Sequence, residues 1–415
     1  MIKIAILGYG VVGSGVAEVI SMNHASLEKQ IGQAIEVSKI LDLRSFPDDP
    51  FGDRITGSAD EILDDPAIQV VVETIGGTGI AFELTKRALA AGKHVVTSNK
   101  ELVATHGLEL ITLARQNAVS YLFEASVGGG IPIIRPLHKC LAANVIEEIT
   151  GILNGTTNYI LTRMEHAGID FSTALQEAQS RGYAEQNPTA DVGGIDACRK
   201  IAILASIATG EFIDSRQIHT EGITDVTVED MAYARGLGCK VKLLGVFRRQ
   251  DGQRYNLIVA PMLVDRESPL AVADDVFNAI VVTGNALGTA MFYGRGAGKL
   301  PTASAVVADV MECVMHLGKQ SHMALWTDSG RENILSHELS PVSALVRLAP
   351  DVDRLKVEQM FSESGYEWIE PAIPGEIAIK VGLNPQIPLQ EGDLSNLLSQ
   401  LGDRAIRMIR FCKVH

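Results

Sequence analysis

Residues 1–20 read MIKIAILGYGVVGSGVAEVI and join a short apolar run, Ile2–Leu7, to a glycine-rich stretch, Gly8-Tyr9-Gly10-Val11-Val12-Gly13. The apolar run has the length of one buried strand, and valine or isoleucine then recurs at positions 12, 16, 19 and 20, which is helical spacing. A GxGxxG pattern between a strand and a helix is typical of dinucleotide sites. Its glycines allow a tight turn and bring a pyrophosphate close to backbone N–H groups. The stretch therefore predicts a nucleotide site, the alternative being a purely structural turn.

Strand and helix patterns continue to alternate through the first 125 residues. Further strands are expected at Ile35–Leu41, Val70–Thr74 and His94–Thr97, with a helix at Phe82–Ala91 that ends at Gly92. Alternation of this kind predicts an α/β fold, a doubly wound Rossmann sheet with helices on both faces.

The pattern changes near residue 145 to a mixed α+β region. Strands are expected at Ile146–Leu153 and Asn256–Val264, and helices at Thr157–His166, Ser172–Ser180, Ile195–Thr209 and Val228–Leu237.

After a polar stretch interpreted as a linker, Ser329–Pro341, the pattern becomes β-α-β-β-α-β. Its six elements are Ser343–Leu348, Leu355–Ser364, Tyr366–Glu370, Glu376–Val381, Leu394–Gly402 and Ala405–Lys413. That order predicts a small ferredoxin-like domain. We therefore expect a Rossmann domain at 1–135, completed by 302–328, a substrate and dimerisation domain at 136–301, and a tail domain at 338–415.

Composition excludes several classes of function. The 415 residues include 36 Lys plus Arg and 50 Asp plus Glu, a net charge of −14, which argues against a nucleic-acid or anionic-membrane partner. No apolar run reaches the ~18 residues of a membrane helix. The five cysteines contain no CxxC pair, which indicates reduced thiols in a cytoplasmic enzyme rather than a disulfide framework or a zinc site. The histidines are scattered, and no HExxH, GxSxG or Walker pattern occurs.

Two clusters follow expected strands of the Rossmann sheet. Asp42 is placed to bind the ribose hydroxyls of NAD, whereas Arg44 is placed to bind the 2′-phosphate of NADP, so both cofactors remain open. Thr97-Ser98-Asn99-Lys100 ends the fourth strand, where ligands of open parallel sheets bind. Lys100 can reach a nicotinamide from there, the alternative being a surface lysine that begins a helix.

A third cluster lies in the expected helix at 195–209. Asp196 and Lys200 are i,i+4 neighbours, and Ile201–Ala208 is almost entirely apolar. Because buried charge is costly without a partner or a purpose, this pair indicates a site more than a surface salt bridge.

Three glycine-rich stretches remain, each as compatible with a structural role as with a functional one. They are Glu124–Pro132, whose carbonyls are suited to a cation, Gly151–Asn158, which joins a strand to a helix, and Gly294–Ala305.

Together these stretches closely resemble the homoserine dehydrogenase family. The resemblance rests on GYGVVG at 8–13, TSNKELVA at 97–104, EASVGGGIPII at 124–134, GILNGTTNYIL at 151–161, AEQNPTADVGGIDACRKIAILA at 184–205 and GRGAGKLPTASAVVADV at 294–310. They occur in the family's order and cover roughly residues 1–330. The tail resembles the ACT-type regulatory domain that many of these enzymes carry.

The resemblance implies reversible conversion of L-aspartate 4-semialdehyde and NAD(P)H to L-homoserine and NAD(P)+, in threonine and methionine biosynthesis. It implies Lys100 and Lys200 at the reacting oxygen, and a substrate site of Glu185, Asp196, Asn154, Gly155 and Thr156. It implies that the nucleotide is lined by the glycine turn with Asp42, Arg44, Thr74, Ser98, Lys100, Gly182 and Gly296. Backbone carbonyls near Glu124, Val127, Gly129 and Ile131 would bind a monovalent cation such as Na+. The expected partner is another copy of the chain, in a homodimer or homotetramer.

The chain departs from the family pattern at a few positions. Asn187 stands where an acid is usual, Gly193 replaces a larger or polar residue, and Glu73–Gly77 varies while keeping its Glu and its glycine pair. Ala349–Asp353 lacks the glycine that commonly follows the first ACT strand, so threonine inhibition is not expected. Two other functions remain open: another Rossmann amino-acid dehydrogenase, and a catalytically inactive nucleotide- or amino-acid-binding regulator.

Overall fold

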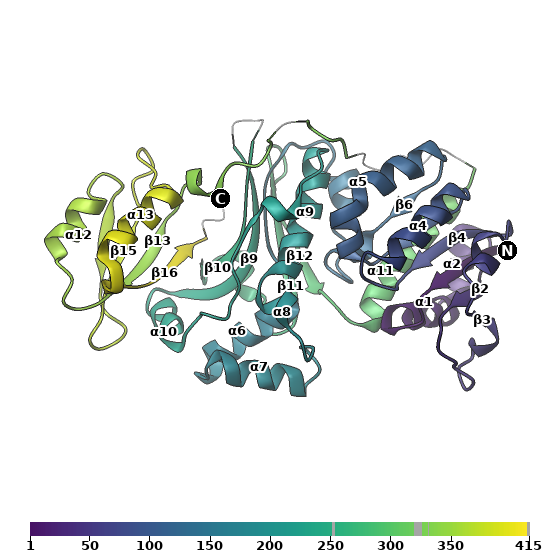
Figure 1. The fold of residues 1–415 in the computed structure, drawn as a ribbon, viewed down its shortest axis with the longest axis horizontal. Helices are drawn as coiled ribbons and strands as arrows, with labels where there is room; N and C mark the ends of the chain where they lie inside the picture. The colour runs from purple at the N-terminus through teal and green to yellow at the C-terminus, as the bar shows by residue number, and fades with distance from the viewer. Residues whose placement is uncertain (251–253, 319–325, 331, 413–415) are drawn as a thin grey trace. The chain divides into compact units, whose positions relative to one another are not determined.

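The structure is a computed structural model that describes residues 1–250, 254–318, 326–330 and 332–412 (Figure 1). The chain forms two compact units. The first contains residues 1–145, 202–215 and 292–330, and the second contains residues 146–201, 216–291 and 331–415. No helix among the described residues has the length and apolarity needed to cross a membrane.

The first unit contains a parallel six-stranded sheet in the order β3-β2-β1-β4-β5-β6. Its strands are β1 (Ile2–Leu7), β2 (Ile35–Leu41), β3 (Ile55–Thr56), β4 (Ile68–Glu73), β5 (His94–Thr97) and β6 (Tyr121–Leu122). Its helices are α1 (Val11–Met22), α2 (His24–Ile31), α3 (Asp60–Leu63), α4 (Ile80–Ala90), α5 (Lys100–Gln116) and α11 (Lys299–Met315). The first strands extend the sheet to one side of β1 and the later strands to the other, so the strand order switches between β1 and β4, as in dinucleotide-binding folds. The α/β prediction is confirmed.

Helix α11 returns from late in the sequence to pack on α1, β4 and β5 (Figure 1). The approach is close at Gly15, where an added Cβ would lie 2.9 Å from the Lys299 carbonyl oxygen and 3.1 Å from the Ala303 Cβ. Val306 and Val310 of α11 join the apolar core beneath the sheet. Residues 319–325 of the segment expected to complete this domain lie outside the described residues.

A mixed sheet organises the second unit, with the order β12-β11-β7-β9-β10-β16-β13-β15-β14 and β8 paired to β10. Its first strands are β7 (Ile146–Ile152), β8 (His219–Thr220), β9 (Cys239–Arg249), β10 (Tyr255–Asp265), β11 (Phe277–Gly284) and β12 (Gly288–Arg295). The helices of this region are α6 (Gly155–Ala167), α7 (Phe171–Ser180), α8 (Thr189–Val192), α9 (Ile195–Thr209, of which the part from residue 202 on belongs to the first unit) and α10 (Val228–Gly236). Helix α6 packs on β9, β11 and α7.

Strand β9 escaped prediction because its sequence contains Lys240 and Lys242, yet both lysines are buried. Asp274 accepts hydrogen bonds from both ammonium groups, at 2.7 Å from Lys240 and 3.0 Å from Lys242. A strand buried on both faces loses the alternation of polar and apolar residues that sequence patterns detect.

The tail has the expected β-α-β-β-α-β order. It comprises β13 (Ala344–Leu348), α12 (Arg354–Phe361), β14 (Tyr366–Ile369), β15 (Ile377–Val381), α13 (Glu391–Leu401) and β16 (Ala405–Phe411), and Lys413 lies outside the described residues. Its strands run antiparallel in the order β16-β13-β15-β14, and β16 adds in parallel to β10 through Met262 and Leu263. The tail therefore extends the sheet of the second unit.

A buried ion-pair cluster fastens the tail to α10. The side chain of Arg347 on β13 is 5% exposed and donates to Asp230 of α10 at 2.6 Å and to Glu376 at 2.6 Å. Asp230 also accepts from the Thr227 backbone N–H at the start of α10, at 3.0 Å. Removing the arginine would leave Glu376 without this partner and Asp230 with only the more distant Arg407, whose Nε lies 3.6 Å from Asp230 Oδ2.

We predict that Arg347→Met lowers the free energy of unfolding by about 3–5 kcal/mol, because breaking a buried pair leaves uncompensated charge. Urea unfolding followed by far-UV circular dichroism measures the effect. Arg404→Met is the matched control, since Arg404 and its partner Asp351 are exposed; it should cost under about 1 kcal/mol. Equal losses of unfolding free energy in the two variants would contradict the stabilising role assigned to the Arg347 ion pairs.

Candidate active site

The glycine turn at the end of β1 allows backbone atoms to lie close to one another and to a ligand. Gly8 adopts a φ of 95°, and a Cβ on Gly13 would lie 2.0 Å from the Gly8 carbonyl oxygen. Thr74, after β4, donates its hydroxyl hydrogen bond to that same oxygen at 2.8 Å. Helix α1 begins after Gly10 without a side-chain cap, so its first N–H groups point toward a ligand position. The turn therefore fits a dinucleotide pyrophosphate.

Asp42 and Arg44 lie directly beside this turn. Asp42 accepts from the Tyr9 backbone N–H at 2.8 Å, and the Arg44 guanidinium donates to both Asp42 oxygens at 2.9 and 2.8 Å. The hydrogen bonds from Arg44 hold the pKa of the Asp42 carboxyl well below its usual range. The site thus offers an ionised acceptor for ribose hydroxyls and, because the Arg44 side chain is 63% exposed, a guanidinium in reach of solvent.

A buried carboxylate organises the ends of β4 and β5. Glu73 accepts from the Thr97 hydroxyl at 2.6 Å and from the backbone N–H groups of Ile75 and Gly76 at 2.8 and 3.2 Å. Its complete burial raises its pKa. Asn99 donates to the Gly77 carbonyl at 2.7 Å, which ties the two loops together.

Lys100 is the first residue of α5, directly after this anchored loop. Asn99 caps the helix by accepting from the Leu102 N–H at 3.1 Å. Ser98 and Lys100 are half-buried, unlike a lysine on an open surface. The loop network therefore fixes the backbone from which the Lys100 side chain extends.

The stretch proposed to bind a cation lies against the third glycine-rich stretch. The Gly130 N–H donates to the Arg295 carbonyl at 3.2 Å, and a Cβ on Gly129 would lie 2.4 Å from the Gly296 oxygen. The Glu124 carboxylate accepts from three successive backbone N–H groups, those of residues 133, 134 and 135, at 2.7–2.8 Å. Glu124 thus orders the loop through its side chain, and its neighbours Val127 and Ile131 are buried.

The second unit carries a buried polar network at the start of α9. Lys200 donates to Asp196 Oδ2 at 2.7 Å and to the Leu153 carbonyl at 2.7 Å. Asn154 donates to the same Asp196 oxygen at 2.8 Å and to Asp191 at 2.7 Å. The Lys200 and Asp196 side chains are 9% and 3% exposed, so the predicted i,i+4 pair is confirmed as a buried one.

Asp191 was not singled out in the sequence. It lies in α8, within the block that contains Asp196, but nothing in its spacing distinguishes it from a surface acid. Its partner Asn154 also caps α6, accepting from the Thr157 N–H at 2.8 Å. The cap therefore fixes the amide that joins the two carboxylates.

Other predicted substrate and cofactor residues lie outside this network. Glu185 is exposed, and its backbone carbonyl accepts from Gln179 at 3.1 Å. Thr156 donates to the Tyr183 carbonyl at 2.6 Å, linking α6 to the loop that carries Glu185. Gly182, also exposed, belongs to that loop, and Gly155 begins α6. Lys100 belongs to the first unit and Lys200 to the second, so their meeting at one nicotinamide stays a prediction.

A Rossmann sheet with a fitted pyrophosphate turn, together with a buried lysine–carboxylate network in a second unit, defines an NAD(P)-dependent oxidoreductase. Family models described as "Homoserine dehydrogenase, NAD binding domain" and "Homoserine dehydrogenase" match residues 8–124 and 132–311. The chain belongs to the homoserine dehydrogenase family.

Individual relatives agree with this placement. The homoserine dehydrogenase of Pseudomonas aeruginosa is 41% identical over 349 residues, covering 83% of this chain and 79% of the relative. A homoserine dehydrogenase structure from Thiobacillus denitrificans superposes with a TM-score of 0.90 at 35% identity, over 99% of this chain and 98% of that one. A hyperthermophilic archaeal homoserine dehydrogenase in complex with NADPH matches with a TM-score of 0.66 at 28% identity, over 77% of this chain and 99% of its own.

Gly13→Ala tests the fit of the turn. The added methyl group must displace the Gly8 carbonyl or the start of α1, so we predict that the Kd for NADPH rises about tenfold or more, ~1.4 kcal/mol. Titration of NADPH fluorescence measures it. Gly57→Ala is the control, because a Cβ there meets nothing within 4 Å. An unchanged Kd in a folded Gly13→Ala protein would contradict the assignment.

Proposed function

We propose that the chain converts L-homoserine and L-aspartate 4-semialdehyde reversibly, with Lys100 and Lys200 at the reacting oxygen. The observation that carries this proposal is the buried Lys200–Asp196–Asn154 network, since an ammonium held this far from solvent needs a chemical reason. Family membership favours this function over another Rossmann dehydrogenase or an inactive regulator.

Reduction of the aldehyde adds a hydride to carbon and a proton to oxygen. The cofactor supplies the hydride when bound. Negative charge develops on the oxygen, and a positioned ammonium stabilises that charge and donates the proton. Asp196 and the Leu153 carbonyl orient Lys200 for this role, and the Asn99 cap positions Lys100. In the reverse direction, the lysine that donated the proton must accept one, and it can do so only in its neutral form. A neighbouring positive charge favours the neutral form by lowering the pKa of the lysine.

Substrate recognition is assigned to the surroundings of the same network. The carboxylates of Asp196 and Glu185 match the ammonium of homoserine, and Asn154, Gly155 and Thr156 supply polar groups at the start of α6. Thr156 holds the loop that presents Glu185, which supports a shared role. Asn187 replaces an acid in that loop, so the pocket carries one negative charge fewer than is usual in the family.

The cofactor is NADP or NAD, held by the glycine turn with Thr74, Ser98, Gly182 and Gly296. Asp42 suits the ribose hydroxyls of NAD, and Arg44 suits the 2′-phosphate of NADP. The NADPH complex of the archaeal relative supports use of NADP. A monovalent cation such as Na+ is assigned to backbone carbonyls near Glu124, Val127, Gly129 and Ile131. The three N–H groups that hold Glu124 support this, because they fix the loop's shape.

We assign the Rossmann domain to residues 1–135 with 302–328, the substrate and dimerisation domain to residues 136–301, and an ACT-like regulatory or assembly domain to residues 338–415. The proposed assembly is a homodimer or homotetramer. The five free cysteines support a cytoplasmic location, where thiols stay reduced.

Lys100→Ala tests the chemistry. We predict that turnover with homoserine and NADP+ falls at least about a hundredfold, the usual contribution of a general acid or base. The Kd for NADPH should change far less than turnover, because Lys100 is only one of many residues assigned to the nucleotide, whereas it acts directly on the substrate oxygen. Nicotinamide absorbance measures turnover, and Lys86→Ala, an exposed lysine of α4, is the control. Near-normal turnover in Lys100→Ala would remove Lys100 from the mechanism.

Arg44→Ala separates the two cofactors. Loss of a charge-assisted hydrogen bond to a 2′-phosphate should raise the KM for NADPH about tenfold or more. The KM for NADH should stay within about twofold, since only ribose hydroxyls face the site in that case. Initial rates with aspartate 4-semialdehyde and each cofactor measure the split. A parallel rise in both KM values would assign Arg44 to shaping the turn alone.

A further inference from the structure

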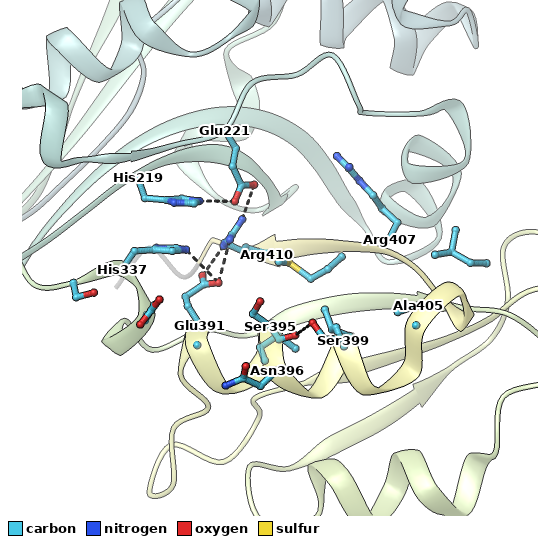
Figure 2. Close-up of a pocket in the computed structure, with 18 residues that line it drawn as sticks. His219, Glu221, His337, Glu391, Ser395, Asn396, Ser399, Ala405, Arg407 and Arg410 are labelled. Carbon is cyan, nitrogen blue, oxygen red and sulfur yellow. Dashed lines mark hydrogen bonds and ion pairs between the residues drawn. The ribbon is translucent and has the colours of Figure 1, made fainter.

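A pocket in the second unit has lining residues that differ from those assigned to catalysis. Its volume is about 1080 Å3, and it lies between β8 and the tail. Figure 2 shows His219 and Glu221 on one side, His337 beside them, and Glu391 and Arg410 contributed by the tail. The sequence placed these histidines 118 positions apart (337 minus 219), which is why they looked scattered.

The two histidine rings stack with centroids 3.6 Å apart and an interplanar angle of 3°. His219 Nε2 lies 2.7 Å from Glu221 Oε1. The buried Nδ1 of His337 has no hydrogen-bond partner among the described residues. His219, Glu221 and His337 each present one ligand atom, and these atoms all lie within 4.8 Å of one another. Because an imidazole nitrogen binds an ion in the plane of its ring, binding one ion through all three atoms requires the two rings to turn out of this stacked arrangement.

The groups around this triad hold its members in place. Arg410 donates to the second oxygen of Glu221 at 2.8 Å and to both oxygens of Glu391 at 2.5 and 3.0 Å. Glu391 Oε2 lies 3.6 Å from His337 Nε2. Carboxylates that contact ligating histidines orient the rings and strengthen metal binding.

The charge of the pocket favours a cation over an anion. Its lining includes three carboxylates, those of Glu221, Glu338 and Glu391, against two guanidinium groups, those of Arg407 and Arg410. With neutral imidazoles the balance is −1. Two imidazoles and one carboxylate form a donor set that suits Zn2+ and related divalent ions and leaves a position for water.

We propose that His219, Glu221 and His337 bind one divalent transition-metal ion of the Zn2+ type at the junction of the tail with β8. This site is independent of the proposed catalytic function.

The position of the site gives the ion a structural consequence. The Glu221 N–H donates to Val259 at 2.7 Å, and the Ile223 N–H donates to Val192 at 2.8 Å. A Cβ on Gly194 would lie 3.0 Å from the Glu221 carbonyl oxygen. The segment that carries Glu221 is thus packed against the turn that starts α9. An ion ligated by Glu221 and His337 would link that segment to the stretch of chain that leads into the tail.

Metal titration of the full-length, untagged, EDTA-treated chain tests the proposal. A Cys140→Ser background removes the exposed thiol as a competing ligand. We expect one Co2+ per chain with visible d–d absorption, displacement of Co2+ by Zn2+, and a higher Tm with Zn2+ present. His219→Gln and His337→Gln should each raise the Kd at least about tenfold. His24→Gln, which removes an exposed histidine of α2, should bind like the parent.

Two results would overturn the site. One is no stoichiometric Co2+ spectrum in the parent chain, and the other is unchanged affinity in the folded His219→Gln/His337→Gln double variant. Far-UV circular dichroism and NADPH binding in EDTA verify that the variants fold. If the double variant does not fold, Glu221→Gln replaces it, since it keeps the side-chain size while removing the ligand charge; unchanged affinity there also overturns the proposal.

Discussion

A lysine ammonium kept out of water is the constraint around which the second unit is arranged. Lys200 retains its charge inside the protein only where acceptors replace its hydration shell, and Asp196 with the Leu153 carbonyl does this. Asp196 in turn is fixed by Asn154, whose position depends on the end of β7 and the start of α6. Strand β7, the Asn154 cap of α6 and helix α9 therefore have to converge so that the buried Lys200 ammonium is stabilised.

The first unit is arranged around a different constraint, the close approach of the cofactor's pyrophosphate to the backbone. Gly8 and Gly13 make the turn compact, and Thr74 and Glu73 hold the loops around it by hydrogen bonds to main-chain atoms. These hydrogen bonds lie within the protein, so the shape of the turn does not depend on contacts with a ligand. Rigid preparation of this kind lowers the entropic cost of binding.

Local patterns in the sequence predicted most of the first unit and the tail. The Gly8–Gly13 turn, the i,i+4 spacing of Asp196 and Lys200, and the six tail elements are all short-range signals, and the structure confirms the α/β fold class and the buried ion pair. What escaped prediction depends on long-range pairing. Strand β9 contains two buried lysines that pair with Asp274, Asp191 meets Asn154 across 37 positions, and His219 stacks on His337, which is 118 positions away in the sequence. Spacing within a window carries no information about such partners.

The parallel pairing of β16 with β10 makes the last strand of the tail part of the central sheet. Removal of the tail would therefore also change the sheet of the second unit. It would uncover main-chain donors and acceptors at Met262 and Leu263, together with the apolar faces packed beside them, and unpaired strand edges invite association with other chains. Gain or loss of such a module therefore demands compensating changes along β10, which constrains how freely this segment can be exchanged between related proteins.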